Sequence, residues 1–193
     1  MASVDSALIE IERAVGSGSV IRDPSMLESY AQDESEVEPC MPEAVVRAST
    51  TADVSAVMKA AYANEVPVIP RGGGTGRVGG AVPVPGSIVL AFEKMNAVEG
   101  INKQELTTRV QPGLITGELK RITEEEGLYY PPDPNSWDSC AIGGNMAANA
   151  GGPRAFKYGV TREYVMGMDV VLADGTVLKL GRETKKGVTG YDL

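Results

Sequence analysis

The residues with the clearest chemical potential form a glycine-rich run at positions 70–80. The run reads Pro70-Arg71-Gly72-Gly73-Gly74-Thr75-Gly76-Arg77-Val78-Gly79-Gly80, and it directly follows an apolar segment typical of a strand. Glycine leaves the main chain accessible, so a row of its backbone N–H groups can hold phosphate oxygens. Arg71 and Arg77 add positive charge at either end. The run therefore predicts a loop that binds a pyrophosphate through its backbone.

Two other phosphate-binding loops fit this run poorly. Gly74, Gly76 and Gly79 match the dinucleotide fingerprint GxGxxG, but that fingerprint requires a helix that starts at its last glycine. Residues 80–86 contain two prolines and a terminal glycine, which prevent a helix. A P-loop is excluded because no Gly-Lys-Ser/Thr sequence occurs. A glycine loop with a purely structural role stays open as the alternative.

A second run of small residues covers positions 139–152, where only Ile142 and Met146 are bulky. Small residues allow two backbones, or a backbone and a flat ring, to approach closely. The run on its own is compatible with tight helix packing. Considered together with the first loop, it is better interpreted as the second wall of the same nucleotide site.

Composition excludes several kinds of chemistry. The chain has 193 residues, a net charge of −8 and no histidine. Without histidine there is no Ser-His-Asp or Cys-His triad and no imidazole base, and we predict no metal site. The acidic balance argues against nonspecific nucleic-acid binding. Cys40 and Cys140 stand alone, which favours free thiols in a reducing compartment, and we expect a cytoplasmic protein.

Neither a signal peptide nor a membrane span is expected. The first 15 residues carry three acids and lack the basic, then apolar, pattern of a signal peptide. No apolar run approaches the roughly 18 residues that a spanning helix needs.

The elements that position the two runs alternate between strands and helices. Residues 44–47, 66–69 and 87–92 are typical of buried strands. We expect Thr51 to cap a helix between the first two strands, which would then be parallel. The acidic stretch 28–43 is predicted to be a solvated loop. Further expected elements are helices at 6–15, 24–30 and 116–126, a strand at 107–110, and a hairpin over 163–180 that turns at Asp174-Gly175.

Several stretches in register then point to a known family. They are the run 70–80, Val-Gln-Pro-Gly at 110–113, Tyr-Pro-Pro-Asp-Pro-Asn-Ser at 130–136 with its continuation to 154, Lys-Tyr-Gly-Val-Thr-Arg at 157–162 with Val170 to Gly175, and residues 186–193. With these the chain resembles the FAD-binding domain of the vanillyl-alcohol oxidase type of flavoprotein. Within that superfamily it is most similar to the group of glycolate oxidase D subunits and D-lactate and D-2-hydroxyglutarate dehydrogenases.

The resemblance implies an α/β (α+β) fold of two subdomains with FAD between them. On this basis we expect an N-terminal helical segment at 1–36, a first FAD-binding subdomain at 37–100, and a second, incomplete subdomain at 101–193. Members of the family continue with a flavin-completing stretch and a cap domain, which are absent from these residues. We therefore expect the sequence to be a fragment.

The resemblance also implies which residues contact FAD. The pyrophosphate would lie on one group: Pro70, Arg71, Gly72, Gly73, Gly74, Thr75, Gly76, Gly79 and Gly80. The ribityl chain and ring would lie along a second group: Pro132, Asp133, Ser136, Gly143, Gly144, Ala147, Asn149, Ala150 and Gly151. The absence of histidine excludes a histidyl-flavin bond, and Cys140 does not have the spacing of the family's linking cysteine. FAD is therefore expected to bind noncovalently.

The function implied is oxidation of a 2-hydroxy acid, of the glycolate or D-lactate type, by hydride transfer to flavin N5. The small-molecule substrate would be bound through the missing cap domain, and an electron-transfer partner subunit is a further expectation. We assign no catalytic residue, because the family's catalytic base is expected to be one of the missing histidines. The alternative is an inactive remnant or non-catalytic subunit that does not hold flavin by itself.

Overall fold

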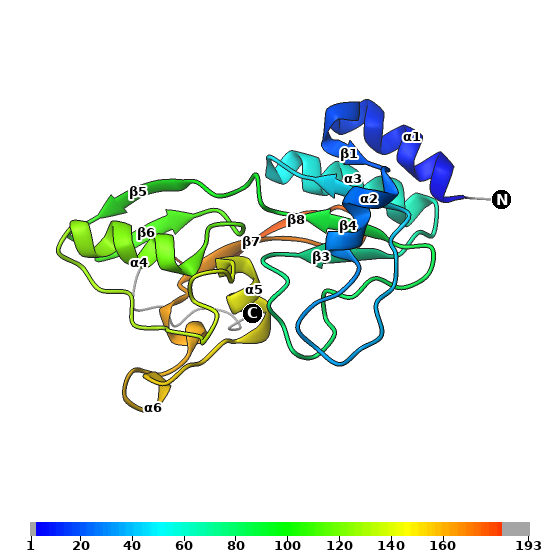
Figure 1. The fold of residues 1–193 in the computed structure, drawn as a ribbon. Helices are drawn as coiled ribbons and strands as arrows, with labels where there is room; N and C mark the ends of the chain where they lie inside the picture. The colour runs from blue at the N-terminus through cyan, green and yellow to red at the C-terminus, as the bar shows by residue number, and fades with distance from the viewer. Residues whose placement is uncertain (1–2, 183–193) are drawn as a thin grey trace.

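The computed structural model describes residues 3–182 and arranges them in two lobes (Figure 1). The first lobe, residues 3–92, contains a four-stranded sheet with helices on both faces. The second lobe, residues 98–164, contains a two-stranded ribbon and the helices α4 and α5. The stretch 186–193, which the family resemblance includes, lies outside the described residues. No helix between residues 3 and 182 is long and apolar enough to cross a membrane.

The sheet of the first lobe is mostly parallel. Its strands follow the order β1-β2-β4-β3, in which β2, β4 and β3 are parallel and β1 pairs antiparallel with β2. The strands expected at 44–47 and 66–69 are parallel, but the second lies two residues later than expected and β4 lies between them. The strand bounds are Val20–Ile21 for β1, Ala44–Arg47 for β2, Val68–Arg71 for β3 and Ile88–Ala91 for β4.

Helices bury both faces of this sheet. Helices α1 (Val4–Val15) and α3 (Thr51–Ala63) share one core with side chains of β2 and β4, including the fully buried Ile11 and Ile88. Helix α2 (Pro24–Leu27) and the 3-10 turn η2 (Glu28–Tyr30) cover the other face, where Leu27 packs with Val45 and Val89. Burial on two faces explains why β2 and β4 are continuous apolar runs.

The start of α3 differs from expectation by one residue. Thr50, rather than Thr51, is the N-cap: its side chain accepts the Asp53 N–H at 3.1 Å, and the Asp53 carboxylate accepts the Thr50 N–H at 3.0 Å. This reciprocal pair is a capping box, in which two otherwise unpaired amides of the first turn are satisfied.

The second lobe has a smaller core. Strands β5 (Val98–Asn102) and β6 (Thr107–Val110) pair antiparallel with a bulge, and Leu119 of α4 (Thr116–Glu125) packs with Leu114 and Ile142. The sequence did not predict β5, because Glu99 and Gly100 interrupt its apolar alternation. Three short helical elements complete the second lobe: α5 (Ile142–Ala148), α6 (Ala155–Tyr158) and η3 (Thr161–Tyr164). A further 3-10 turn, η1 (Ser17–Ser19), lies in the first lobe.

The hairpin of β7 (Gly167–Val171) and β8 (Val177–Gly181) returns the chain to the first lobe. Its turn at Asp174-Gly175 confirms the expected DG turn, and Gly175 has a φ of 80°. The buried Ser55 hydroxyl of α3 donates a 2.6 Å hydrogen bond to the Gly175 carbonyl. The hairpin thereby ties the end of the described chain to the helix that covers the first sheet.

Candidate functional site

The glycine run 72–80 leaves the first sheet at the end of β3. Because β2, β4 and β3 are parallel, this is the carboxyl edge of the sheet, where α/β proteins bind their ligands. No helix follows: residues 76–87 form turns and irregular chain. The expectation that this run is not a Rossmann fingerprint is thus confirmed, since no helix dipole is present to meet a pyrophosphate.

The amides of this loop are available to a ligand. Within residues 3–182, none of the backbone N–H groups from Gly72 to Gly80 donates a hydrogen bond to the protein. Gly74 and Gly79 have φ angles of 69° and 76°, a conformation that few residues other than glycine adopt. Successive unpaired N–H groups in such a turning chain form a nest for an anion.

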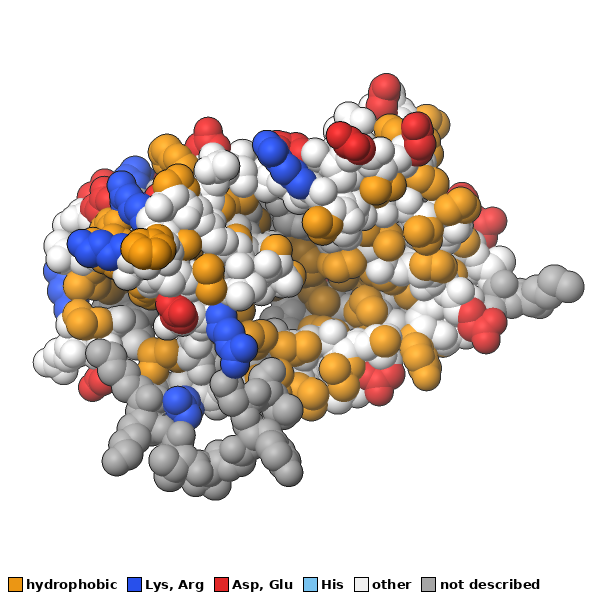
Figure 2. Space-filling view, turned by 90° about the horizontal axis from the view of Figure 1, so that it is seen from below, with side chains coloured by type: hydrophobic (Ala, Val, Ile, Leu, Met, Phe, Trp, Pro, Cys, Tyr) orange, Lys and Arg blue, Asp and Glu red, His pale blue; other side chains and the backbone are white. Residues whose placement is uncertain are grey.

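The second run of small residues lies directly against this loop. A Cβ at Gly73 would overlap the carbonyl oxygen of Ser139, and a Cβ at Gly72 would lie 3.1 Å from the Ala141 side chain. The Ser136 hydroxyl also donates to Thr75 Oγ1 at 3.4 Å. The structure therefore brings together the two runs that the sequence singled out, one from each lobe. Viewed from below, the surface is hollowed between the lobes (Figure 2).

The small residues of the second run form α5 and serve two purposes. A Cβ at Gly143 would lie 2.7 Å from Pro112, so this glycine permits close packing within the lobe. Gly144 and Ala147, one turn apart, are exposed, and a Cβ at Gly144 would meet no atom of the described residues within 4 Å. The two interpretations of this run, tight packing and an open wall, therefore apply to different residues of one helix.

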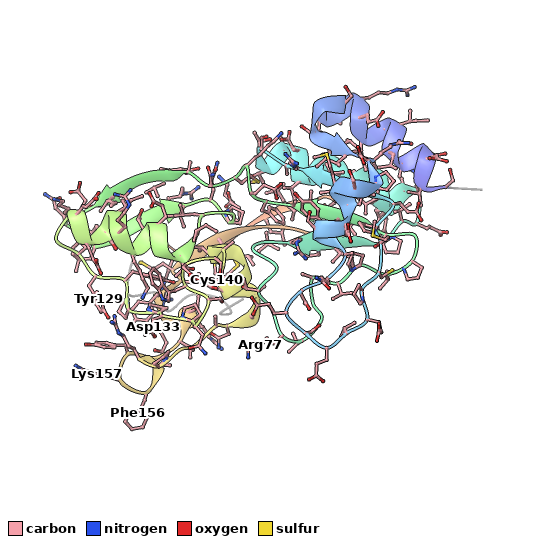
Figure 3. All side chains as sticks on the ribbon, in the orientation of Figure 1. Arg77, Tyr129, Asp133, Cys140, Phe156 and Lys157 are labelled. Carbon is pink, nitrogen blue, oxygen red and sulfur yellow. The ribbon has the colours of Figure 1, made fainter. Side chains whose placement is uncertain are left out.

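The segment 130–136 is held in place by the turn that follows α5. A Cβ at Gly152 would overlap the Asp133 carbonyl, and the Asp133 carboxylate accepts the Arg154 N–H at 3.1 Å and lies 3.4 Å from Arg154 Nε. Pro132 is buried and Ser136 half-buried. Figure 3 shows Asp133 among these chain segments, with Lys157 and Phe156 directed outward. Asp133 is thus engaged with the protein itself.

The residues just after α5 are ordered by side-chain and backbone contacts. Asn149 adopts a left-handed φ of 46°, and its side-chain oxygen accepts the Arg162 N–H at 3.0 Å. The Ala150 carbonyl accepts both the N–H and the hydroxyl of Thr161, at 3.0 and 2.8 Å. Gly151 packs near Val160. These contacts hold the end of the second wall.

The two arginines of the glycine run do not point into the hollow. The Arg71 guanidinium donates to the carbonyls of Gln32 at 2.8 Å and Ser29 at 3.3 Å, and it stacks over the Tyr30 ring. Arg77 is largely exposed, 3.8 Å from Glu34 (Figure 3). Pro70 and Gly80 lie exposed at the two ends of the run, and a Cβ at Gly80 would meet no described atom within 4 Å. The charge of Arg71 is therefore used to fix the loop to the protein.

A buried polar cluster that the sequence did not reveal supports α5. The Asn145 amide donates to the Thr116 hydroxyl at 2.5 Å, and that hydroxyl lies 3.3 Å from both the carbonyl and the sulfur of Cys140. All three residues are buried. Because the partners come from three separate segments, no local spacing could have identified them. Among the described residues, no group of three or more Cys, Asp or Glu side chains is arranged to hold a metal ion.

The chain is similar to known proteins in sequence. The sequence model of a family described as "FAD binding domain" matches residues 42–181. The chain is 44% identical over 164 residues to glycolate oxidase subunit GlcD of Bacillus subtilis (strain 168), covering 85% of this chain and 35% of that protein. It is 39% identical over 191 residues to D-lactate dehydrogenase of Anaerostipes hadrus, covering 98% of this chain and 40% of that protein.

It is also similar to solved structures. Alkyldihydroxyacetonephosphate synthase superimposes with a TM-score of 0.84 at 21% identity, covering 95% of this chain and 36% of that one. Substrate-bound p-cresol methylhydroxylase superimposes with a TM-score of 0.78 at 26% identity, and the match covers 92% of this chain and 35% of that one.

The chain spans 35–41% of the length of the first three curated relatives. A dinucleotide held between two walls would fit the glycine loop, whose amides have no partner among residues 3–182, together with the Ser139 segment that it contacts and the exposed residues of α5. The family model covers most of the described residues. The chain belongs to the FAD-binding domain family of the vanillyl-alcohol oxidase type, and FAD is the cofactor that this membership indicates.

Proposed function

We propose that this chain is the FAD-binding portion of a flavin-dependent oxidoreductase that oxidises a 2-hydroxy acid of the glycolate or D-lactate type. The names of its relatives, which include a glycolate oxidase subunit and D-lactate and D-2-hydroxyglutarate dehydrogenases, support this substrate class. The observation that carries the proposal is the row of amides from Gly72 to Gly80 beside the second wall, which have no hydrogen-bond partner in the described part of the chain. We propose the domain limits 1–36, 37–100 and 101–193 with it.

In this proposal each wall has a distinct task. The loop 72–80 holds the pyrophosphate by backbone N–H groups, which bind an anion without a helix or a lysine. The exposed face of α5, with Gly144 and Ala147, and the segment 132–136 lie along the ribityl chain and ring. FAD is held noncovalently, since the chain has no histidine to form a histidyl bond.

When bound, the flavin supplies the capacity to accept a hydride from C2 of the hydroxy acid. The residues of this chain bind and orient the cofactor, and none is assigned as catalytic. We propose that the catalytic base and the substrate carboxylate contacts come from a cap domain, that electrons leave through a partner subunit, and that the protein acts in the cytoplasm.

Titration of the purified chain with FAD tests the proposal. We expect quenching of flavin fluorescence and a bound flavin absorption spectrum. Gly74→Val should abolish both, because a β-branched residue is strained at a φ of 69° and its Cβ would overlap the Arg71 guanidinium. Gly18→Ala is the control, since Gly18 has no neighbour within 4 Å.

A wild-type chain that folds but retains no flavin after excess FAD is removed would contradict the proposal and favour the non-binding remnant. Turnover of glycolate or D-lactate is a separate measurement. We expect it only when a cap domain is supplied together with this chain.

A further inference from the structure

The acidic stretch 28–43 is not simply a solvated loop. Figure 1 shows it beside the glycine loop below the sheet, where the blue loop is the acidic stretch and the green loop is the glycine loop. The Glu34 N–H donates to the Gly76 carbonyl at 3.0 Å. The Asp33 carboxylate accepts the Ala81 N–H at 3.3 Å and the Ser35 N–H at 2.9 Å. The stretch therefore contacts the glycine loop directly.

Two more contacts hold the same side of the loop. At its start, the Arg71 guanidinium donates to the carbonyls of Ser29 and Gln32 within the stretch. Near its end, Val37 packs against Gly79, where a Cβ would lie 2.7 Å from the valine methyl group. The loop is thus fixed to the stretch at both ends and at Gly76, while its own N–H groups from Gly72 to Gly80 have no partner among residues 3–182.

Asp33 places a negative charge next to a loop suited to an anion. A Cβ at Gly76 would lie 3.7 Å from Asp33 Oδ2. Burial raises the pKa of Asp33, but hydrogen bonds from Ser35 and Ala81 and the charge of Arg71 outweigh it and leave the pKa below its usual value. The group is therefore ionised at neutral pH. The negative charge of Asp33 would by itself repel a phosphate. Any contribution of Asp33 to phosphate binding must therefore come from its hydrogen bonds to Ala81 and Ser35.

We propose that the stretch 28–43 is the support of the glycine loop, and that Asp33 is a positioning residue that fixes the loop's end through the Ala81 amide so that the free amides face the ligand. The proposal rests on the proposed function, in which that ligand is the pyrophosphate of FAD. Asp33 itself does not contact the cofactor.

The variant Asp33→Asn tests whether Asp33 acts through its hydrogen bonds or through its charge, because the two roles change the affinity for FAD in opposite directions. Asparagine keeps the shape but offers one acceptor oxygen in place of two, so it cannot accept the Ala81 and Ser35 N–H groups together, and one of the two hydrogen bonds is lost. We expect the affinity for FAD to fall about tenfold, the value of one charge-assisted hydrogen bond. Removal of a nearby negative charge alone would instead strengthen anion binding. Glu38→Gln is the matched control, since Glu38 is exposed in the same stretch and loses the same charge.

Partial ligands show which part of the cofactor is affected. ADP, which carries the pyrophosphate, should lose affinity for Asp33→Asn by the same factor as FAD. Riboflavin, which carries no phosphate, should bind as it does to the wild type. An unchanged or tighter affinity for FAD, or an equal loss for riboflavin, would overturn the proposal.

Hydrogen exchange tests the support in the absence of any ligand. In Asp33→Ala the Ala81 amide loses its acceptor, and we expect it to exchange at least about tenfold faster than in wild type, with the amides of α3 unchanged. Equal exchange at Ala81 in both proteins would refute the positioning role. If the wild type binds no FAD, the proposed function fails, while this measurement still decides the role of Asp33.

Discussion

At the residue scale, the glycines of the two runs differ in what they permit. Some, such as Gly73, allow two segments of backbone to touch, and others, such as Gly144, leave a face open. The sequence could indicate that both runs need bare backbone. It could not indicate which residue each glycine contacts. Gly73 meets Ser139, and Gly143 meets Pro112, and in each pair the two residues are distant in sequence and are brought together only when the chain folds.

Gly73→Ala should separate the two walls. Its Cβ would overlap the Ser139 carbonyl, a backbone atom that cannot move alone. We expect FAD affinity to fall by at least about tenfold, while the first-lobe core stays folded. Fluorescence titration and far-UV circular dichroism measure the two quantities, and Gly18→Ala again provides the comparison. Wild-type affinity in Gly73→Ala would mean that the contact of the walls is not needed.

Tyr130 should make stability depend on pH in alkaline solution. Burial, together with Cys140 and Tyr164 nearby, raises the pKa of Tyr130 to about 12. Below the unfolded pKa of about 10, the ring is neutral in both states, and its contribution is fully present. Between pH 10 and 12 the unfolded chain ionises first, so the free energy of unfolding falls as pH rises.

Tyr130→Phe removes this source of pH dependence. Urea unfolding at a series of pH values should show a shallower loss of stability from pH 10 to 12 than in wild type. Tyr62→Phe, at an exposed ring, is the control. Identical slopes in Tyr130→Phe and wild type would contradict the assignment.

At the element scale, the positions of helices and strands follow from the local pattern of apolar residues, whereas the order in which the strands pair in the sheet does not. Strands β2 and β3 are recognisable from the apolar runs at 44–47 and 66–69, although β3 lies two residues later, at Val68–Arg71, and the helix between them is recognisable from its spacing. Their separation by β4 depends on residues 88–91, which the chain reaches only after the glycine loop. A βαβ unit fixes the direction of its strands, but another strand can still insert between them.

The capping box of α3 predicts that Thr50 and Thr51 contribute differently to the free energy of unfolding. Thr50→Ala should reduce the free energy of unfolding by about 1 kcal/mol, since it removes the acceptor of the Asp53 N–H. Thr51→Ala should have a smaller effect, because Thr51 is the first helical residue and makes no cap hydrogen bond. Urea denaturation measures both variants, and equal losses would show that the box does not stabilise the helix.

At the scale of the whole molecule, the two lobes are joined by contacts between residues distant in sequence. One is the contact of the glycine loop with the Ser139 segment, and the hairpin that follows the second lobe adds the hydrogen bond from Ser55 to Gly175 in the first lobe. The family resemblance indicated that two subdomains enclose FAD. It did not indicate that the acidic stretch supports the loop, because charge pattern alone is typical of a solvated surface.

Ser55→Ala should weaken the attachment of the hairpin to α3. It removes a buried hydrogen bond of 2.6 Å from the Gly175 carbonyl, and we expect a loss of about 1–2 kcal/mol in the free energy of unfolding. Ser17→Ala, an exposed serine, serves for comparison. Equal unfolding midpoints for Ser55→Ala and wild type would show that water replaces the lost partner.

The hairpin also has a consequence for the order in which the chain is assembled. Ser55 and Gly175 are 120 residues apart, and Val171 packs against the core of the first lobe. During synthesis the first lobe leaves the ribosome with this part of α3 still uncovered, and it stays so until β7 and β8 emerge. Contacts of such long sequence separation carry a large loop-closure entropy cost, which slows folding. The lobe that begins the chain is therefore completed only by the strands that come last among the described residues.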